Sequence, residues 1–162
     1  MAMPTLTTEP LLAVRAAPTV VVIDTNTALD FLVFADPAVT AIGAAVETGA
    51  SRWLVCERMR EELHRVLDYP LVAKRREARG LSVDHVMQRF DALTTRVVAA
   101  PKAPYTCKDP DDQVFIDLAV AHQATLYSKD HAVLAMRGQR PHSCPPAPAI
   151  GASICMHWRV SV

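Results

Sequence analysis

Apolar residues follow two different spacings along this chain. Three short segments, residues 19–23 (TVVVI), 52–56 (RWLVC) and 124–128 (ATLYS), are rich in β-branched and other apolar side chains. Runs of this kind are typical of strands that are buried in a parallel sheet. Between them, apolar residues recur at helical spacing, which predicts amphipathic helices. The helices are expected over about residues 36–49, 57–67, 82–98, 112–121 and 131–136.

Polar residues, glycine and proline mark where these elements begin and end. Residues 24–27 (DTNT) follow the first strand, and their side chains suit the free N–H groups of a helix start. Gly49 and Tyr69-Pro70 end two of the helices. Residues 71–79 form a basic segment, and residues 152–160 are a candidate for a final edge strand.

Strands that are separated by helices indicate successive βαβ units. The sequence therefore predicts an α/β fold with a mostly parallel central sheet and helices on both faces. Residues 1–18, which contain three prolines, are expected to form a flexible leader. Residues 19–162 are expected to form a single domain, with residues 138–150 as a proline-rich loop within it.

Composition and charge narrow the possible classes of protein. The 162 residues are 51% hydrophobic and 21% charged, and the formal net charge is zero. The molecule is therefore not a polycation, and any binding of nucleic acid must come from a local patch. No apolar run approaches the roughly 20 residues of a membrane helix, and no secretory signal is recognisable near the N-terminus. We therefore expect a cytoplasmic protein that does not bind membranes.

The four cysteines are widely spaced and include no CxxC motif. We interpret them as reduced thiols. The nearest approach to a zinc pattern is His142-x-Cys144 with Cys155-x-His157, in the proline-rich tail. Loop residues and buried thiols are the better interpretation of these pairs, because the tail has no clear zinc-site pattern.

Acidic residues gather at the ends of the predicted strands. Asp24 ends the first strand, and Asp130 follows the strand over residues 124–128. Asp112 stands at the start of the helix before that strand, and Glu62 lies in the helix that follows the second strand. The carboxyl ends of parallel strands and the starts of the following helices share one edge of the sheet. We therefore expect these four acids to meet at that edge.

Acids that share one edge repel one another and raise one another's pKa values unless a cation lies between them. Oxygen ligands alone suit Mg²⁺ or Mn²⁺ rather than zinc. Such a site suits hydrolysis of a phosphodiester by metal-activated water. Taken singly, Asp24, Asp112 and Asp130 are more often helix caps, and Glu62 is more often a solvated surface residue. The expectation of a metal site depends on their shared edge.

Four short motifs carry a resemblance to a known family. They are Val22-Ile23-Asp24-Thr25-Asn26, Glu62-Leu63-x-x-Val66-Leu67, Asp109-Pro110-Asp111-Asp112 with Phe115 and Ala119, and Ser128-Lys129-Asp130. In this order and spacing they resemble the PIN-domain ribonucleases, in particular the branch of toxin components from toxin–antitoxin pairs. The resemblance implies a three-layer α/β/α sandwich and a Mg²⁺- or Mn²⁺-dependent endoribonuclease that cleaves single-stranded RNA.

The resemblance also implies roles for individual residues. The implied catalytic and metal-binding residues are Asp24, Glu62, Asp112 and Asp130. Asp109 corresponds to an auxiliary metal-binding acid, and Asn26 and Ser128 to polar residues that support Asp24 and the active-site loop. The implied partners are single-stranded RNA, a cognate antitoxin protein and, in a homodimer, a second copy of the chain.

Basic residues near this edge are candidates for contacts with the RNA backbone. The family usually has Gly before its fourth acid and another Asp two residues after it, where this chain has Lys129 and Ala132. Lys129 could bind a substrate phosphate, or it could weaken metal binding by repulsion. The other candidates for phosphate contacts are Arg75, Arg76 and Arg79, for which a solvated helix face is the alternative.

Two other functions compete with the ribonuclease. A haloacid-dehalogenase-like phosphatase also opens with a strand that ends in Asp, but it needs an acid two residues later, where this chain has Asn26. A catalytically silent PIN-like module that binds nucleic acid or protein is compatible with Lys129 and Ala132. Binding of Mn²⁺ distinguishes the ribonuclease from the silent module, because a silent module should bind little Mn²⁺.

Overall fold

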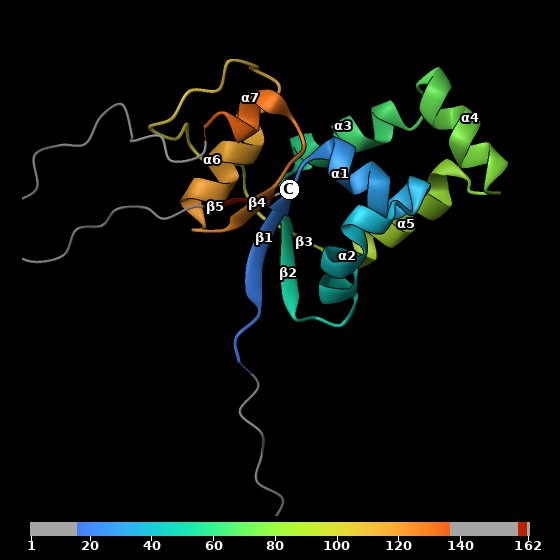
Figure 1. Cartoon of the computed structure of the whole chain (residues 1–162), viewed down its shortest axis with the longest axis horizontal. Coiled ribbons are helices and arrows are strands. Elements are labelled where there is room, and N and C mark those ends of the chain that lie inside the picture. The colour runs from blue at the N-terminus through green and yellow to red at the C-terminus, as the bar shows by residue number, and fades with distance from the viewer. Residues whose placement is uncertain (1–15, 137–158, 162) are drawn as a thin grey trace, which may run out of the picture.

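The computed structural model describes residues 16–136 and the backbone of residues 159–161. Its strands form one sheet in the order β3-β2-β1-β4-β5, and every neighbouring pair is parallel. The strands are β1 Thr19–Ile23, β2 Ser51–Val55, β3 Thr94–Arg96, β4 Thr125–Tyr127 and β5 Arg159–Ser161. The chain leaves the central strand β1 for β2 on one side and later reaches β4 on the other side (Figure 1).

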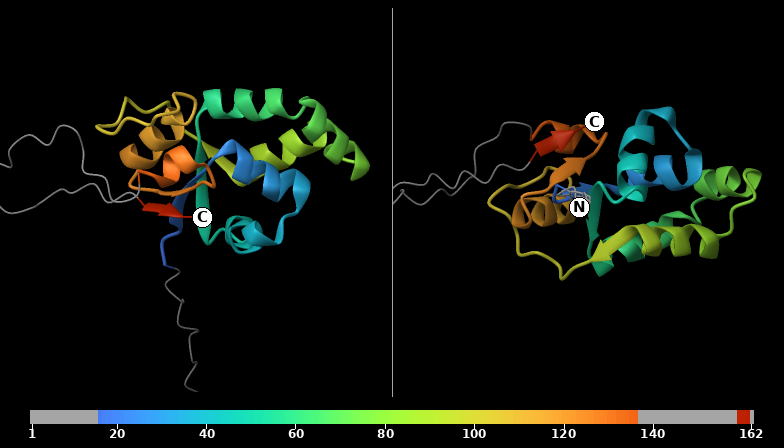
Figure 2. Two further views of the ribbon diagram at one scale, coloured as in Figure 1. Left: turned by 45° about the horizontal axis from the view of Figure 1, so that its top comes forward. Right: turned by 90° about the horizontal axis from the view of Figure 1, so that it is seen from below.

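Helices cover both faces of this sheet. They are α1 Thr25–Leu29, the π-helix η1 Asp30–Phe34, the 3₁₀ helix η2 Pro37–Val39, α2 Thr40–Glu47, α3 Glu57–Val66, α4 Pro70–Ala78, α5 Val83–Leu93, α6 Gln113–Ala121 and α7 His131–Leu134. Figures 1 and 2 show α6 and α7 on one side of the sheet and α1, α2 and α5 on the other. The predicted α/β fold with a parallel sheet between two helical layers is therefore confirmed.

Side chains along the central strands alternate between the two faces of the sheet, and this divides the core into two parts. Val21 and Ile23 of β1 pack among residues of α1, α2 and α5 on one face. Val22, between them in sequence, packs against α6 and α7 on the other face. Because successive side chains of a strand point to opposite faces, a run without polar residues fits a strand that is covered on both sides.

Two segments differ from the expected elements. The helix predicted over residues 82–98 ends at Leu93, and Thr94–Arg96 pairs with β2 as the edge strand β3. Two adjacent β-branched threonines favour the extended backbone here, although Val97 continued the helical spacing of apolar residues. The basic segment 71–79, to which no structure was assigned, forms most of α4, which has Pro70 at its first position.

Several expectations fall on parts of the chain outside the described residues. These are the leader up to residue 15, the proline-rich loop 138–150, the tail cysteines and histidines, and most of the candidate strand 152–160, of which residues 159 and 160 belong to β5. Cys56 and Cys107 are buried free thiols, as expected. Within the described ranges no single helix is long and apolar enough to cross a membrane. The bent pair Thr25–Phe34 and Pro37–Glu47 meets that criterion only when its two parts are taken together.

We predict that Leu126→Ala in β4 lowers the free energy of unfolding by about 2–5 kcal/mol. Leu126 is fully buried against α6 and α7, so its removal leaves a cavity between the sheet and those helices. Leu71→Ala in α4 is the matched control, because Leu71 is 80% exposed and its loss should change stability by no more than about 0.5 kcal/mol. Urea unfolding measures both values, and equal losses would contradict the described packing.

Candidate functional site

Pairing of β1 with β4 brings the ends of two distant segments together. Ile23 is in register with Tyr127, and the Asp24 amide donates a hydrogen bond to the Tyr127 carbonyl oxygen at 3.0 Å. Asp24 therefore lies beside Ser128, and both residues are buried. The strand order reverses between β1 and β4, which is where α/β sheets usually bind their ligands.

Asp24 and Asp130 each cap the helix that follows them with one carboxylate oxygen. Asp24 Oδ1 accepts a hydrogen bond from the Thr27 amide at 2.7 Å, and Asp130 Oδ1 accepts one from the Ala132 amide at 2.7 Å. The Ser128 hydroxyl oxygen accepts a hydrogen bond from the Asp130 amide at 3.1 Å. Each cap engages one oxygen and leaves the second oxygen of the same carboxylate for another partner.

Asp112 is the most perturbed acid at this edge. Its Oδ2 is buried and receives no hydrogen bond from any described donor. Burial, followed by the charges of Asp130, Asp109 and Asp24 and by a side-chain interaction with Asp130 that favours the protonated form, raises the pKa of Asp112 to about 7. These three acids therefore lie close enough to Asp112 to oppose its ionisation.

A hydrogen-bond network holds the loop that leads to Asp112. The Gln113 side chain accepts from the Cys107 amide at 2.8 Å and donates to the Tyr105 carbonyl oxygen at 2.9 Å. It also donates to Asp117 Oδ1 at 2.7 Å, and that oxygen accepts from the Ala103 amide. Gln113 and Asp117 of α6 thus hold residues 103–107 in place, and these residues lead into the acidic motif at residues 109–112.

Glu62 reaches the same edge from α3 but has different neighbours. The Thr25 hydroxyl donates a hydrogen bond to Glu62 Oε1 at 3.2 Å, next to Asp24 in the chain. Partial burial raises the pKa of Glu62 above its ordinary value, and the charge of Asp111 acts in the same direction. Asp109 is exposed, and its Oδ1 accepts from the Asp111 amide at 2.9 Å.

The donor set fits a hard divalent cation in its chemistry. Every predicted ligand supplies carboxylate oxygens, and the buried Asp112 Oδ2 is an acceptor without a donor. In the described part of the chain, however, no three acidic, histidine or cysteine side chains are arranged closely enough to hold one metal ion. Binding of one ion by these acids would therefore require changes in side-chain conformation.

Lys129 is engaged by a residue that the sequence did not single out. Its ammonium group forms an ion pair with Asp30 Oδ2 of the π-helix η1, and Asp30 is buried. The pair raises the pKa of Lys129, and the charges of Asp36 and Asp24 add to this effect. The lysine therefore ties the β4–α7 loop to η1, so its charge is already compensated within the protein.

The basic residues of α4 differ in their exposure. Arg76 is buried and donates hydrogen bonds to the carbonyl oxygens of Leu67 and Leu81, at 3.4 and 2.8 Å. Its expected role as an RNA contact is therefore corrected, because the guanidinium joins two turns of the chain instead. Arg75 and Arg79 are exposed, and that expectation remains a prediction for both.

The supporting polar residues also differ from expectation. Ser128 supports the amide of Asp130, as described above. Asn26 is exposed, and among the described residues its side chain makes no hydrogen bond to Asp24. Thr25 and Asp30 take up the supporting contacts, to Glu62 and Lys129. Thr25 directly follows Asp24, so its position at the site could be read from the sequence, whereas the contact of the buried Asp30 with Lys129 depends on the turn of η1.

Comparison with known proteins adds one finding. Residues 20–126 match a family model described as PIN domain, which is about two thirds of the chain. The match includes Asp24, Glu62 and Asp112 and stops before Asp130. No curated protein matches the chain.

We predict that Asp112→Asn stabilises the metal-free protein at high pH. Because the folded-state pKa of Asp112 is raised to about 7, ionisation destabilises the fold as the pH rises from about 4 through 7. The variant should therefore unfold roughly 3–6 °C higher than the parent at pH 8, about 1–2 kcal/mol after allowance for solvent screening. The difference should vanish near pH 4. Thermal unfolding in EDTA between these pH values measures it, and an unchanged or lower midpoint at pH 8 contradicts a raised pKa of Asp112 in the folded protein.

We predict that Lys129→Met lowers the free energy of unfolding by about 1–2 kcal/mol, because it leaves the buried Asp30 carboxylate without a counter-ion. Lys74→Met on the exposed face of α4 is the control and should change stability by at most about 0.5 kcal/mol. Adding Asp30→Asn to Lys129→Met should recover part of the loss. Urea unfolding measures the series, and a Lys129→Met variant as stable as the control would refute a structural ion pair.

Proposed function

The chain belongs to the PIN domain family, and on that premise we propose that it is a Mg²⁺- or Mn²⁺-dependent endoribonuclease that cleaves single-stranded RNA. PIN domains are typically nucleases, and they typically bind Mg²⁺. The observation that carries the proposal is the buried Oδ2 of Asp112, which receives no hydrogen bond from a described donor. Asp112 lies near Asp130 and Asp24, at the edge where the strand order reverses between β1 and β4.

The chain offers a consistent set of ligands for such an ion. Asp24 and Asp130 would contribute the oxygens that their helix caps leave free, and Asp112 would contribute its unpartnered Oδ2. Asp109, whose charge acts on Asp112, is an auxiliary acid. When bound, a divalent cation lowers the pKa of a water molecule and stabilises negative charge on the phosphoryl oxygens.

Glu62 suits a different task. Its raised pKa lets the carboxylate take up a proton more readily than an ordinary surface glutamate. The Thr25 hydroxyl engages Oε1, so the carboxylate is held in one orientation and Oε2 faces no described donor. We assign Glu62 the orientation of the attacking water and the acceptance of its proton, while the three aspartates hold the cation.

Electrostatics also explains why the cation and the substrate would bind together. RNA carries one negative charge per nucleotide, and the edge holds several carboxylates with one paired lysine. Without a cation, this edge repels the phosphate that it is proposed to cleave. Lys129 lowers the local negative charge through Asp30 without occupying the oxygens of Asp24, Asp112 or Asp130.

We further propose that the chain is the toxin of a toxin–antitoxin pair, with a cognate antitoxin protein and a homodimer as partners. The order and spacing of the four motifs support this assignment. Growth arrest on expression of the chain alone, relieved by the product of an adjacent small gene, is the outcome that this proposal requires.

A catalytically silent binding module is the second candidate. The observation in its favour is that no three potential ligands converge on one point in the described part of the chain. The two candidates differ in their affinity for Mn²⁺, because the enzyme must close its carboxylates around the ion and the silent module need not. Isothermal titration with Mn²⁺ therefore distinguishes them.

We predict that the protein cleaves single-stranded RNA only with Mg²⁺ or Mn²⁺, and that Asp112→Asn lowers the rate at least about 100-fold, a loss of about 2.7 kcal/mol in transition-state stabilisation. Asp68→Asn is the matched control, since Asp68 is exposed beyond the end of α3 and should retain full activity. A fluorescent RNA cleavage assay measures both. Cleavage by Asp112→Asn at the parental rate, or equal activity in EDTA, would refute the mechanism.

A further inference from the structure

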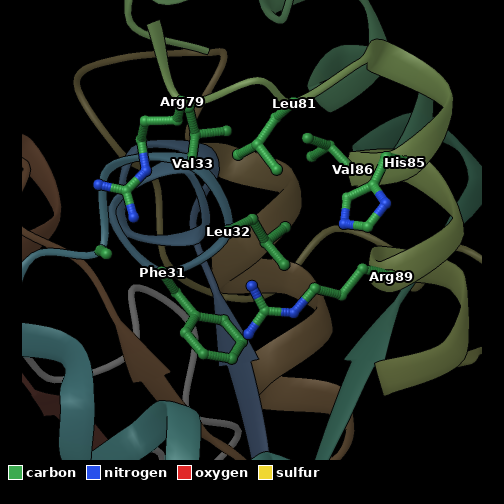
Figure 3. A pocket seen from close by; sticks show the side chains of 9 residues that line it. Phe31, Leu32, Val33, Arg79, Leu81, His85, Val86 and Arg89 are labelled. Carbon is green, nitrogen blue, oxygen red and sulfur yellow. The ribbon is translucent and has the colours of Figure 1, made fainter. Parts of the chain in front are cut away.

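A cavity of about 310 Å³ lies between η1 and α5, and none of the predicted acidic ligands lines it (Figure 3). Leu32 and Val33 of η1 line one wall, and Leu81 and Val86 line the other. Volumes of small-molecule sites begin at about 300 Å³, so the space suits a single compact group. It is too small for a helix of a partner protein, which needs an extended groove.

Cationic and polar side chains share the lining with these apolar residues, and polar atoms make up more than half of its exposed surface. Figure 3 shows Arg79 and Arg89 on opposite sides of Leu32, with His85 next to Arg89 on α5. Arg89 is already engaged, because its Nη2 lies 2.7 Å from Glu47 Oε1. Arg79 is exposed, and no carboxylate pairs with it among the described residues. One guanidinium at the rim is therefore available to an anion from outside.

An aromatic ring at the rim is fixed in place. The Arg89 guanidinium carbon lies 4.8 Å from the centroid of the Phe31 ring. On α2, a Cβ at Gly43 would come within 2.4 Å of Phe31 Cε2, so only glycine lets the ring pack this close to that helix. The ring is thus held between α2 and α5 before any ligand binds. Binding of a ligand therefore loses less conformational entropy from this side chain.

The helix η1 connects this cavity to the candidate catalytic edge. Asp30 at its start pairs with Lys129, and the next residues, Phe31 to Val33, line the cavity. From Asp24 to Leu32 the chain advances about 12 Å at helical rise, a span that a few extended nucleotides can cover. A π-helical turn such as η1 is rare and often occurs at functional sites.

We propose that this cavity receives one unstacked nucleotide of the single-stranded RNA whose cleavage is proposed above, with its base on the apolar wall beside Phe31 and its phosphate at Arg79. The inference rests on that proposed function and adds a subsite for the substrate. Single-stranded RNA presents bases free to leave the stack and enter apolar or aromatic pockets, each joined to a phosphate that arginine binds. An acidic protein segment would supply the negative charge but no flat apolar group for the cavity.

Binding of a labelled single-stranded hexaribonucleotide tests the proposal, measured by fluorescence anisotropy with the full chain in EDTA to prevent cleavage. Arg79→Ala should weaken binding and reduce the slope of log K against log salt by about 0.7, the value for one phosphate contact to a single strand. Leu81→Trp, which fills the cavity, should weaken binding at least threefold. Arg52→Ala is the control, because Arg52 is exposed at the start of β2, at the opposite end of the sheet.

A second ligand separates the base from the phosphate. Leu81→Trp should leave unchanged the affinity for an oligomer of abasic ribose phosphates, while Arg79→Ala should weaken it. The proposal is overturned if both variants bind RNA as the parent does, or if an oligoglutamate peptide of equal charge competes as well as RNA. Either of these results would overturn the nucleotide subsite without contradicting RNA cleavage by the parent. Absence of any RNA binding by the parent in EDTA would overturn the cavity's role, whereas absence of RNA cleavage with Mg²⁺ or Mn²⁺ would overturn the proposed function.

Thermal unfolding identifies variants that are simply unfolded. Binding is measured only for variants whose melting temperature lies within about 3 °C of the parent's. Should Leu81→Trp not meet this criterion, His85→Trp narrows the same cavity from an exposed position on α5. It carries the same expectation, a selective loss for RNA over the abasic oligomer.

Discussion

Parallel pairing of β1 with β4 is the constraint on which the candidate site depends. One backbone hydrogen bond, from the Asp24 amide to the Tyr127 carbonyl oxygen, aligns Asp24 with Ser128. β1 is buried on both faces, and β4 packs against it with Leu126 buried and Tyr127 half-buried, so the two strand ends are held side by side. The carboxylates stay together at a cost in ionisation, because burial of Asp112 and then the charges of its acidic neighbours raise the pKa of Asp112 to about 7. A cation is the simplest agent that removes this cost.

Helix capping and metal binding are usually treated as competing roles for an aspartate at a strand end. Asp24 and Asp130 show that the roles are compatible, because each engages one oxygen in the cap. The cap fixes the plane of the carboxylate and thereby orients the second oxygen. Asp112 occupies the N-cap position of α6, but its side chain makes no capping bond. It is the least constrained of the three aspartates and the one whose movement could complete a ligand shell.

The sequence predicted the parallel sheet because the sheet follows from local patterns, and the same patterns assigned the candidate acids to one edge of it. Periodicity was enough to identify β1 from its β-branched run. Strand topology was enough to assign the acids after β1 and before α6 to the same edge. The supporting contacts were not predictable in this way. Arg76 lies in a basic segment and was a candidate for contact with RNA, yet it donates hydrogen bonds to two carbonyl oxygens that come together only in the folded chain. The edge strand β3 likewise owes its form to pairing with β2, which overrides the helical spacing of apolar residues up to Val97.

The π-helix η1 explains how one short segment can serve two sites. Five residues follow α1 without a break, and the chain then turns at Ala35 with a positive φ of 50°. The wider turn directs Asp30 toward Lys129 at the acidic edge while Phe31 reaches Gly43 on α2. Neither contact follows from an ordinary helix drawn on the sequence, because both depend on the altered residue spacing of the π-turn. A substitution that restored regular α-helical spacing in η1 should therefore disturb the loop of Asp130 and the cavity together, which couples the position of an acid to the shape of the proposed nucleotide subsite.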